Sequence, residues 1–314
     1  MASDDPALAV DIGGTKLAAA LVEPGGRLAG YIRTETPARM DGEALWRTLV
    51  ALLGKLLADH GDPALAGVGV GCGGPMTWPA AVVSPLSIPA WRDFPLRDRL
   101  AERFPALPVR VHNDAVCVAV GEHWRGAGRG KDNVLGMVVS TGVGGGLVLD
   151  GRLIDGASGN AGHIGHVVVD PTGPECLCGG RGCLEAVARG PNLVAWAQAQ
   201  GWRPGRPATG VELSADAARG HPTATAALRR AGRALGIAIA SATHLCDLEV
   251  VAIGGGISQA GSRLFDPLDE TFRAHARMDF AREVRVVPAA LGQTAGLVGA
   301  AALIFAPTPY WHAA

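Results

Sequence analysis

A strand that runs into a glycine turn and returns as a second strand occurs twice in this chain, once in each half. In the first copy, Gly13 and Gly14 join two β-rich runs within residues 8–22. In the second copy, a glycine turn over residues 141–146 joins two such runs within residues 134–150. Strands joined by a short glycine turn form hairpins. The repetition predicts two related α/β domains, each of which contributes one glycine turn to a shared cleft.

The rest of the chain alternates between helical and strand-like patterns. Apolar residues at Leu45, Leu49 and Leu53 recur every four residues, which is the spacing of one face of a helix. Helical patterns of this kind predict helices over residues 43–59, 115–124, 191–200, 223–245 and 295–305. Short apolar runs predict strands over residues 8–12, 17–22, 67–70, 109–111, 134–140, 147–150, 249–253 and 283–287. This order of elements indicates the α/β class.

The composition argues against several classes of protein. Hydrophobic residues make up 48% of the 314 residues and charged residues 18%, which suffices for a buried core and argues against disorder. The formal net charge of -1 argues against a nucleic-acid-binding surface. The longest apolar stretches, such as residues 234–242, are too short to span a bilayer, and no signal peptide is visible. We therefore expect a cytoplasmic protein that binds neither nucleic acid nor membrane.

Three of the six cysteines lie in one octapeptide, Cys176-Leu-Cys178-Gly-Gly-Arg-Gly-Cys183, and His166 lies ten residues before it. Three thiolates and one imidazole complete the closed tetrahedral shell of a structural Zn²⁺. A closed shell has no open position for water, so we expect this zinc to order the loop and not to take part in chemistry. The alternative is three reduced cysteines in a turn. The other cysteines are isolated and are interpreted as small apolar residues: Cys72, Cys117 and Cys246.

The first glycine turn has the composition of a phosphate site. The backbone N–H groups of Gly13 and Gly14 can approach phosphate oxygens closely, and the hydroxyl of Thr15 adds a donor. Asp11, at the strand end, can bind a hydrated Mg²⁺ that bridges the phosphates. The alternative is an ordinary hairpin turn. The second glycine turn, which contains Thr141, favours the phosphate site.

Asn113 and Asp114 lie where a predicted strand ends and a predicted helix begins. A carboxylate at such a place can accept the proton of a sugar hydroxyl as that oxygen attacks a γ-phosphate. Asn and Asp are also the favoured residues at helix N-caps, and the position alone favours the cap. The two roles are compatible, so a cap would not exclude catalysis.

Two longer motifs extend over these features: DIGGTK at residues 11–16, and GASGNAGHIGHVVVDPTGPECLCGGRGCLE at residues 156–185. With them the chain resembles, over essentially its whole length, the ROK family of bacterial sugar kinases and related repressors. The resemblance implies the actin-like (ribonuclease H-like) ATPase fold, an α/β fold of two domains around a central cleft. The implied domains are residues 1–114, with the helix of about residues 295–314 packed back on it, and a larger zinc-loop domain of residues 115–294.

The resemblance also implies an activity and the residues of its site. The chain is expected to use ATP with Mg²⁺ to phosphorylate the primary (6-) hydroxyl of a hexose or an N-acylhexosamine, with Asp114 as the catalytic base. The implied sugar contacts are Gly74, Ser87, Asn113, Asp114, His163, His166 and Glu185. The implied ATP contacts are Asp11, Gly13, Gly14, Thr15, Lys16, Thr141, Gly142, Gly254, Gly255 and Gly256. The implied zinc ligands are Cys176, Cys178, Cys183 and His166, whose other ring nitrogen serves the sugar.

Two positions depart from the family's pattern. Most of its kinases have Glu in the motif ExGH where this chain has His163, and its glucokinases usually have Asn where this chain has Ser87. A histidine donates as well as accepts hydrogen bonds, which could suit an acetamido carbonyl. The AGHIGH sequence is similar to that of the family's bacterial N-acetylmannosamine kinases. N-acetylmannosamine is therefore the expected substrate, and a glucokinase or other hexokinase of the family is the alternative.

Two rival functions come from other classes. A sugar-responsive transcriptional regulator of this family needs a DNA-binding segment before the first glycine turn, and only ten residues precede Asp11. A non-catalytic sugar sensor is argued from His163 and Ser87, whereas the retained Asp11 and Asp114 argue against it. Polyphosphate as the donor stays open, and the resemblance implies a homodimer or homotetramer.

Overall fold

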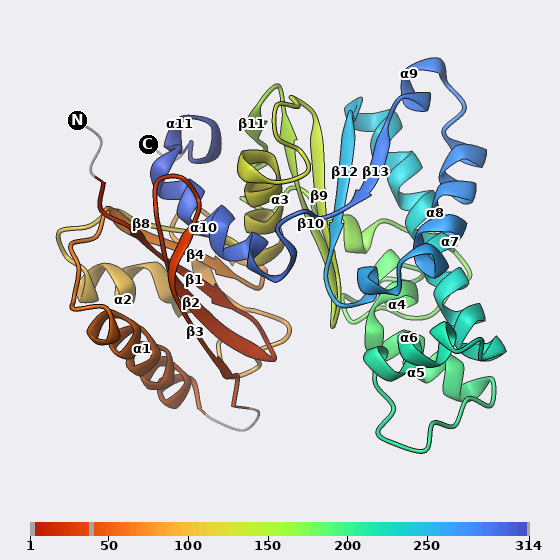
Figure 1. Ribbon diagram of the computed structural model, residues 1–314, viewed down its shortest axis with the longest axis horizontal. Coiled ribbons are helices and arrows are strands. Elements are labelled where there is room, and N and C mark those ends of the chain that lie inside the picture. The colour runs from red at the N-terminus through yellow and green to blue at the C-terminus, as the bar shows by residue number, and fades with distance from the viewer. Residues whose placement is uncertain (1–3, 38–40, 313–314) are drawn as a thin grey trace.

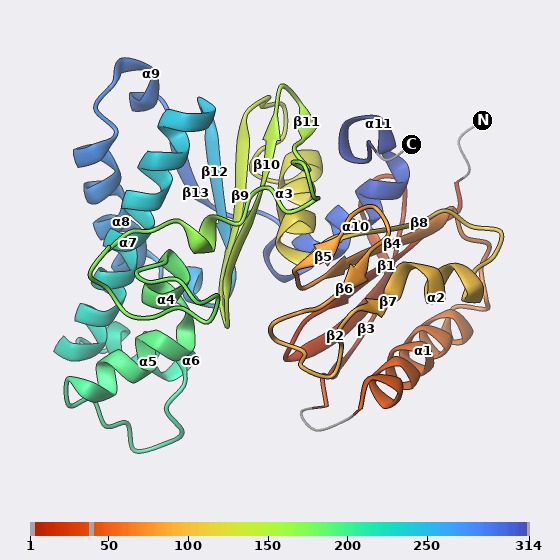
Figure 2. The ribbon, with the colours of Figure 1, turned by 180° about the vertical axis from the view of Figure 1, so that it is seen from behind.

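The computed structural model describes residues 4–37 and 41–312, which form two five-stranded sheets and a smaller three-stranded one (Figure 1). The predicted domain ranges also contain residues 1–3, 38–40 and 313–314, which lie outside the described residues. The two larger sheets lie side by side, with helices between them and on their outer faces (Figures 1 and 2).

The first sheet has the strand order β3-β2-β1-β4-β8. Its strands are β1 (Ala7–Ile12), β2 (Lys16–Val22), β3 (Leu28–Glu35), β4 (Gly67–Cys72) and β8 (Val109–Asn113). β1 and β2 form the predicted hairpin, and β1, β4 and β8 run parallel. Helices α1 (Gly42–Asp59) and α2 (Leu96–Arg103) lie on one face, where Leu45, Leu49 and Leu53 are buried as their spacing predicts.

The second sheet has the strand order β11-β10-β9-β12-β13. Its strands are β9 (Val134–Val139), β10 (Val143–Leu149), β11 (Arg152–Leu153), β12 (Val250–Gly254) and β13 (Arg285–Pro288). β9 and β10 form the second hairpin, and β9, β12 and β13 run parallel. The helices of this half are α4 (Leu184–Ala188), α5 (Gly190–Ala199), α6 (Gly210–Ala218), α7 (Pro222–Cys246), α8 (Ser262–His275) and α9 (Asp279–Arg282).

Two helices lie between the sheets, α3 (Asp114–Arg125) and α10 (Ala295–Phe305) (Figure 1). α3 contacts β9 and β10 of the second sheet and also β4 of the first, whereas α10 packs on β1 and β4. The short helix α11 (Pro307–Tyr310) follows α10. The predicted domain boundary at residue 114 coincides with the start of α3, and the division into domains stays a prediction.

The second glycine turn is shorter than the sequence predicts. β10 begins at Val143, whereas the glycine pattern predicts a turn over residues 141–146 and a strand over 147–150. The prediction is wrong because the strand's own glycines are required by helix packing: a Cβ built on Gly144 would lie only 2.7 Å from the Cβ of Ala115 in α3. Glycines in this strand therefore let α3 approach the sheet.

Several elements were not among those that the sequence predicts. They are β3, β11, α2, α4, α6, α8, α9, α11, the three-stranded sheet of β5 (Met76–Thr77), β6 (Val82–Val83) and β7 (Phe94–Pro95), and the 3-10 turns η1 (Ile164–His166), η2 (Ile257–Ala260) and η3 (Gly292–Thr294). Among the helices of the described ranges, none is both long and apolar enough to cross a membrane.

Candidate active site and metal centre

Two acidic residues lie at the carboxyl-end edge of the first sheet, because its strands β1, β4 and β8 are parallel. Ile12 pairs with Cys72, and Cys72 pairs with Asn113, so β1, β4 and β8 all terminate at the same edge. Open α/β sheets bind ligands outside the carboxyl ends of their strands. Asp11 is the last residue but one of β1, and Asp114 directly follows β8. The topology therefore brings both predicted acidic residues to this edge.

Asn113 is the N-cap of α3. Its Oδ1 accepts a hydrogen bond from the N–H of Ala115 at 3.0 Å, and the Oδ1 of Asp114 accepts from the same N–H at 2.8 Å. The other end of the Asn113 amide, Nδ2, faces Gly74: a Cβ built on that glycine would lie 3.0 Å from it. The cap and the predicted sugar contact thus use different atoms of Asn113.

The carboxyl group of Asp114 has an unusual pKa. The side chain is half-buried, and its removal from water raises its pKa to about 6. The negative charge of Asp11 also raises this pKa, whereas the N–H of Ala115 and the ammonium of Lys16 lower it. A general base acts best when its pKa lies near the working pH. At pH 7 Asp114 is mostly ionised, yet it accepts a proton readily.

Asp11 pairs with a cation and provides a fitting ligand for Mg²⁺. Its Oδ2 lies 3.2 Å from the Nζ of Lys16, and its side chain is 16% exposed. Asp11 is also close enough to Asp114 to raise the pKa of that group. Mg²⁺ usually takes one or two protein carboxylates together with phosphate oxygens and water. The excess of negative charge here suits a magnesium nucleotide bound through Asp11.

The first glycine turn lies against Ser87. A Cβ built on Gly14 would lie 2.5 Å from the Cβ of Ser87, so the close approach of the two segments requires glycine at this position. The Oγ of Ser87 would lie 3.6 Å from a Cβ on Gly73. Thr15 is exposed at the tip of the turn. Ser87 is thus located between the predicted phosphate turn and the loop that carries Gly74.

The second glycine turn lies against Glu185. The Oε2 of Glu185 accepts a hydrogen bond from the N–H of Val143 at 2.9 Å and would lie 3.0 Å from a Cβ on Gly142. Thr141 is exposed in this turn. A predicted sugar contact, Glu185, is therefore bonded to the edge of a predicted phosphate turn.

The third glycine segment, at the end of β12, lies beside the second turn. It consists of Gly254, the last residue of β12, followed by Gly255 and Gly256. Gly254 pairs with Val138 of β9, and a Cβ built on Gly256 would lie 3.8 Å from the Oγ of Ser140. Gly255 has a φ of +93°, a conformation that side chains other than glycine rarely adopt. The two glycine segments predicted for ATP in the second half are therefore neighbours.

His163 lies next to Gly74, and its ring stacks with that of His166. Their ring centroids are 6.1 Å apart, and the Nε2 of His163 would lie 3.7 Å from a Cβ on Gly74. Burial lowers the pKa of His163, the nearby His166 lowers it further, and a hydrogen bond to the backbone of Asn160 partly opposes the shift. His163 is therefore neutral at pH 7, with one ring nitrogen that donates and one that accepts.

The four predicted zinc ligands converge. The candidate ligand atoms of His166, Cys176, Cys178 and Cys183 all lie within 4.8 Å of one another. The Nδ1 of His166 is 3.8 Å from the Sγ of Cys176, and the Sγ atoms of Cys178 and Cys183 are 3.8 Å apart. Zinc–sulfur bonds of about 2.3 Å in a tetrahedron give edges of about 3.8 Å. The donor set and its spacing therefore fit a closed zinc site, and leave the Nε2 of His166 for another partner.

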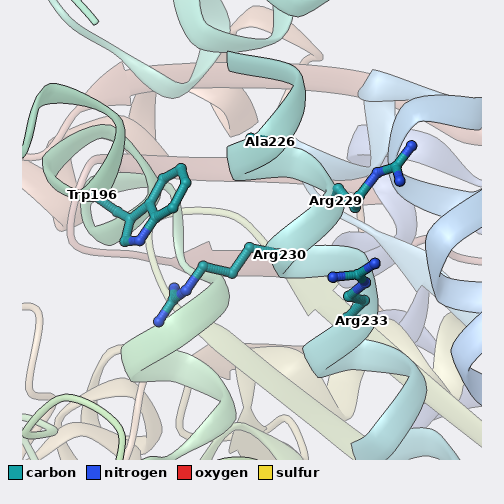
Figure 3. Close-up of a pocket in the computed structure, with 5 residues that line it drawn as sticks. All are labelled: Trp196, Ala226, Arg229, Arg230 and Arg233. Carbon is teal, nitrogen blue, oxygen red and sulfur yellow. The ribbon is translucent and has the colours of Figure 1, made fainter. Parts of the chain in front are cut away.

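The surface cavities mark this site only in part. A cavity of about 350 Å³ lies between α5 and α7, and its wall contains none of the predicted site residues. Figure 3 shows the five side chains that line it: Trp196, Ala226, Arg229, Arg230 and Arg233. A smaller cavity of about 150 Å³ lies beside the zinc loop and includes Cys176 and Glu185 in its wall. We locate the site by the converging strand ends, because the chemistry of the side chains is there.

One polar pair next to the site has no sequence signal. The buried His112 bonds to Asp155, 43 residues away, and directly precedes Asn113. The position of His112 beside Asn113 and Asp114 is the one hint in the sequence that it matters. Nothing in the sequence indicates that its partner is Asp155, in a loop after a strand of the other sheet.

Comparison with known proteins places the chain in a family. The model of the ROK family matches residues 7–306. A glucokinase from Thermotoga maritima is 35% identical over 95% of this chain and 96% of its own length. An N-acetylmannosamine kinase from Escherichia fergusonii is 37% identical over 94% of this chain and 97% of its own.

The fold agrees with that family. The crystal structure of a ROK family glucokinase from Streptomyces griseus, in complex with glucose and AMPPNP, has a TM-score of 0.84 at 34% identity. The match covers 95% of this chain and 98% of that one. The predicted actin-like α/β fold is thereby confirmed, and so is the predicted resemblance: the chain belongs to the ROK family.

Proposed function

We propose that this protein transfers the γ-phosphoryl group of ATP to the primary (6-) hydroxyl of an N-acylhexosamine, with N-acetylmannosamine as the first candidate. That it is an enzyme, an ATP-dependent sugar kinase, follows from its kinase relatives at 35% and 37% identity over nearly the whole chain. The observation that carries the proposed chemistry is the half-buried Asp114, with a pKa of about 6, at the strand edge that it shares with Asp11.

In the proposed reaction, Asp114 is the base. Its carboxylate accepts the proton of the sugar hydroxyl as that oxygen attacks the γ-phosphorus, and the bond to the leaving ADP oxygen breaks. Asn113 orients the sugar through Nδ2, the amide end that the helix cap leaves available. Fixing the hydroxyl against its base removes much of the entropic barrier to the reaction.

The two glycine turns are proposed to bind the nucleotide. Backbone N–H groups of Gly13 and Gly14 on one side, and of the turn at Gly142 on the other, suit phosphate oxygens. Asp11 would bind the Mg²⁺ of the nucleotide, and that ion supplies positive charge to the transferring phosphoryl group. Gly254–Gly256 would lie on the nucleotide side of the second turn. Lys16 adds a cation 3.2 Å from Asp11.

We assign the selection of the sugar to residues in and next to the predicted zinc loop. The neutral His163 both donates and accepts, which suits the N–H or C=O of an acetamido group better than a carboxylate would. His166, Glu185, Gly74 and Ser87 complete the proposed sugar contacts. The zinc is proposed to be structural. A sugar without the matching hydrogen-bonding group leaves buried polar groups of the protein unpaired, which weakens the binding of that sugar. These contacts therefore decide which sugar is accepted.

Glucose is the second candidate substrate, because the relatives include glucokinases as well as N-acetylmannosamine kinases at similar identity. Formation of the sugar 6-phosphate is to be measured with N-acetylmannosamine, glucose, N-acetylglucosamine, mannose and fructose, with ATP and separately with polyphosphate as the donor. The highest kcat/KM is expected for N-acetylmannosamine with ATP. A preference for glucose would replace the first candidate by the second. Binding of a sugar without any turnover would favour a sensor or a transcriptional regulator. A homodimer or homotetramer and a cytoplasmic location stay predictions.

A further inference from the structure

A buried carboxylate joins three segments that are far apart in the sequence. The Oδ1 of Asp155 lies 2.9 Å from the Nε2 of His112, and its Oδ2 lies 3.1 Å from the Nδ1 of His312. His112 belongs to β8 of the first sheet, Asp155 follows β11 of the second sheet, and His312 follows α11. His112 is fully buried and Asp155 is 8% exposed. An acidic residue is seldom buried to this extent without partners, and here both oxygens have one.

The hydrogen bonds fix the tautomer of His112. The backbone N–H of Asn113 donates to the Nδ1 of His112 at 2.8 Å, so this nitrogen is an acceptor. The ring proton is therefore on Nε2, which donates it to Asp155. The imidazole thus connects the carboxylate of Asp155 to the backbone of Asn113. Because β8 is the edge strand of its sheet, no further strand of the described residues lies beyond it to fix this N–H.

The hydrogen bonds from Asp155 through His112 lead to Asn113, which is followed by the proposed base Asp114. Asn113 caps α3, and Asp114 is the first residue of that helix, so the backbone at position 113 sets the direction of both side chains. A displacement of about 1 Å in a reacting group can lower a rate about 100-fold. We infer that His112 and Asp155 are positioning residues: Asp155 orients the His112 ring, and the ring fixes the backbone that presents Asn113 and Asp114 to the sugar.

The C-terminal segment covers this pair. The ring of Trp311 contacts that of Trp78 edge to face, with centroids 5.7 Å apart, and Trp78 lies 6.4 Å from the ring of His112. The hydroxyl of Tyr310 lies 2.6 Å from the Nδ1 of His123 in α3. These contacts keep His312 over Asp155. His312 is 33% exposed, so its substitution should affect the pair less than substitution of Asp155 itself.

Two substitutions of His112 separate positioning from a purely structural role. In His112→Asn, the amide oxygen replaces Nδ1 as acceptor for the N–H of Asn113, while the bond to Asp155 is lost. In His112→Gln, the amide N–H reaches Asp155, while the acceptor for Asn113 is lost. Positioning therefore predicts the higher kcat for the Asn variant. A merely structural role predicts the higher kcat for the Gln variant, because that variant keeps the buried carboxylate paired.

Asp155 is tested in both backgrounds, in a double-mutant cycle. Asp155→Ala should lower kcat about tenfold when His112 is present, because the ring is no longer oriented. In the His112→Asn background it should leave kcat unchanged, because no ring remains to orient. Asp155→Leu, which is similar in size and has no acceptor oxygen for the His112 ring, replaces the Ala variant if that variant does not fold. His275→Asn, on the exposed surface of α8, is the matched control and should retain the wild-type kcat.

The measurement is kcat and KM for sugar and for ATP on the full chain, with thermal unfolding to establish that each variant is folded. The expected result is a kcat about tenfold lower for His112→Gln than for His112→Asn, with KM for ATP within about threefold. A His112→Gln variant as active as His112→Asn, or Asp155→Ala effects equal in both backgrounds, overturns the inference alone. The inference rests on the proposed function, so a wild-type protein that phosphorylates no sugar overturns both.

Discussion

The Oε2 of Glu185 accepts a 2.9 Å hydrogen bond from the N–H of Val143. Glu185 lies two residues after Cys183, the last predicted zinc ligand, and Val143 begins β10 directly after the second glycine turn. This one bond connects the cysteine loop to a turn proposed to bind phosphate. A change in the loop should therefore be transmitted to the nucleotide side of the site.

Loss of one thiolate should remove the metal. Cys178→Ser is expected to lower the zinc content from one ion per chain to well below one. The KM for ATP and the KM for the sugar should both rise, because Glu185 is displaced together with the cysteine loop. Metal analysis by mass spectrometry and steady-state kinetics check this. Cys246→Ser is the matched control, since Cys246 ends α7 and is not part of the cluster. Full zinc content in Cys178→Ser would contradict the ligand assignment.

Activity should decline on the acid side. Because burial and Asp11 raise the pKa of Asp114 to about 6, kcat/KM should fall about tenfold per pH unit below that value, as the base becomes protonated. The profile is measured from pH 5 to 8 with saturating magnesium. A kcat/KM that stays constant down to pH 5 would show that the ionisation of Asp114 does not limit the reaction.

The same pKa makes a prediction for stability. The folded protein binds this proton more tightly than the unfolded chain, whose carboxyl keeps a pKa near 3.8, so the ionised Asp114 lowers stability as the pH rises from about 4 to about 6. Asp114→Asn should therefore be more stable than the wild type at pH 7.5, by about 1 to 3 kcal/mol, and about equal at pH 4. Urea unfolding at the two pH values checks this. A less stable variant at pH 7.5 would be the contrary result.

His163 should determine which sugar the enzyme prefers. His163→Glu introduces a carboxylate that only accepts hydrogen bonds, in place of a neutral ring that also donates. The ratio of kcat/KM for N-acetylmannosamine to that for glucose should fall at least tenfold, which corresponds to loss of one buried hydrogen bond of about 1.4 kcal/mol. His163→Gln, neutral and able to donate, is the control and should retain more of the preference. An unchanged ratio in His163→Glu would remove this residue from the account.

The elements with strong local patterns could be predicted from the sequence. The leucine stripe of α1 and the two glycine hairpins are examples, since their periodicity or turn residues act over a few positions. α8 was not predicted, because it contains Pro267 inside the helix. α2 was not predicted either, because it is only eight residues long and its buried leucines are just two, Leu96 and Leu100.

The chemistry of the site was predictable only in part. The cysteine spacing predicted a cluster that the structure brings together, because its ligands lie close in sequence. Glycines of β10 looked like a turn, because the reason for them, the approach of α3, lies outside the local sequence. The His112–Asp155 bond depends on two sheets meeting, which no local pattern records. The raised pKa of Asp114 likewise depends on burial and on a charge contributed by another strand.

The central claim is that Asp114 accepts the proton of a sugar hydroxyl during phosphoryl transfer from ATP. Asp114→Asn keeps the size of the side chain and its bond to the N–H of Ala115, but removes the base. Formation of the sugar 6-phosphate by wild type and variant is to be followed by phosphorus NMR, with sugar binding measured by calorimetry. The account predicts a turnover at least about 100-fold lower in the variant, with sugar affinity within a few fold of the wild type. Equal rates of sugar phosphate formation by the two proteins would contradict it.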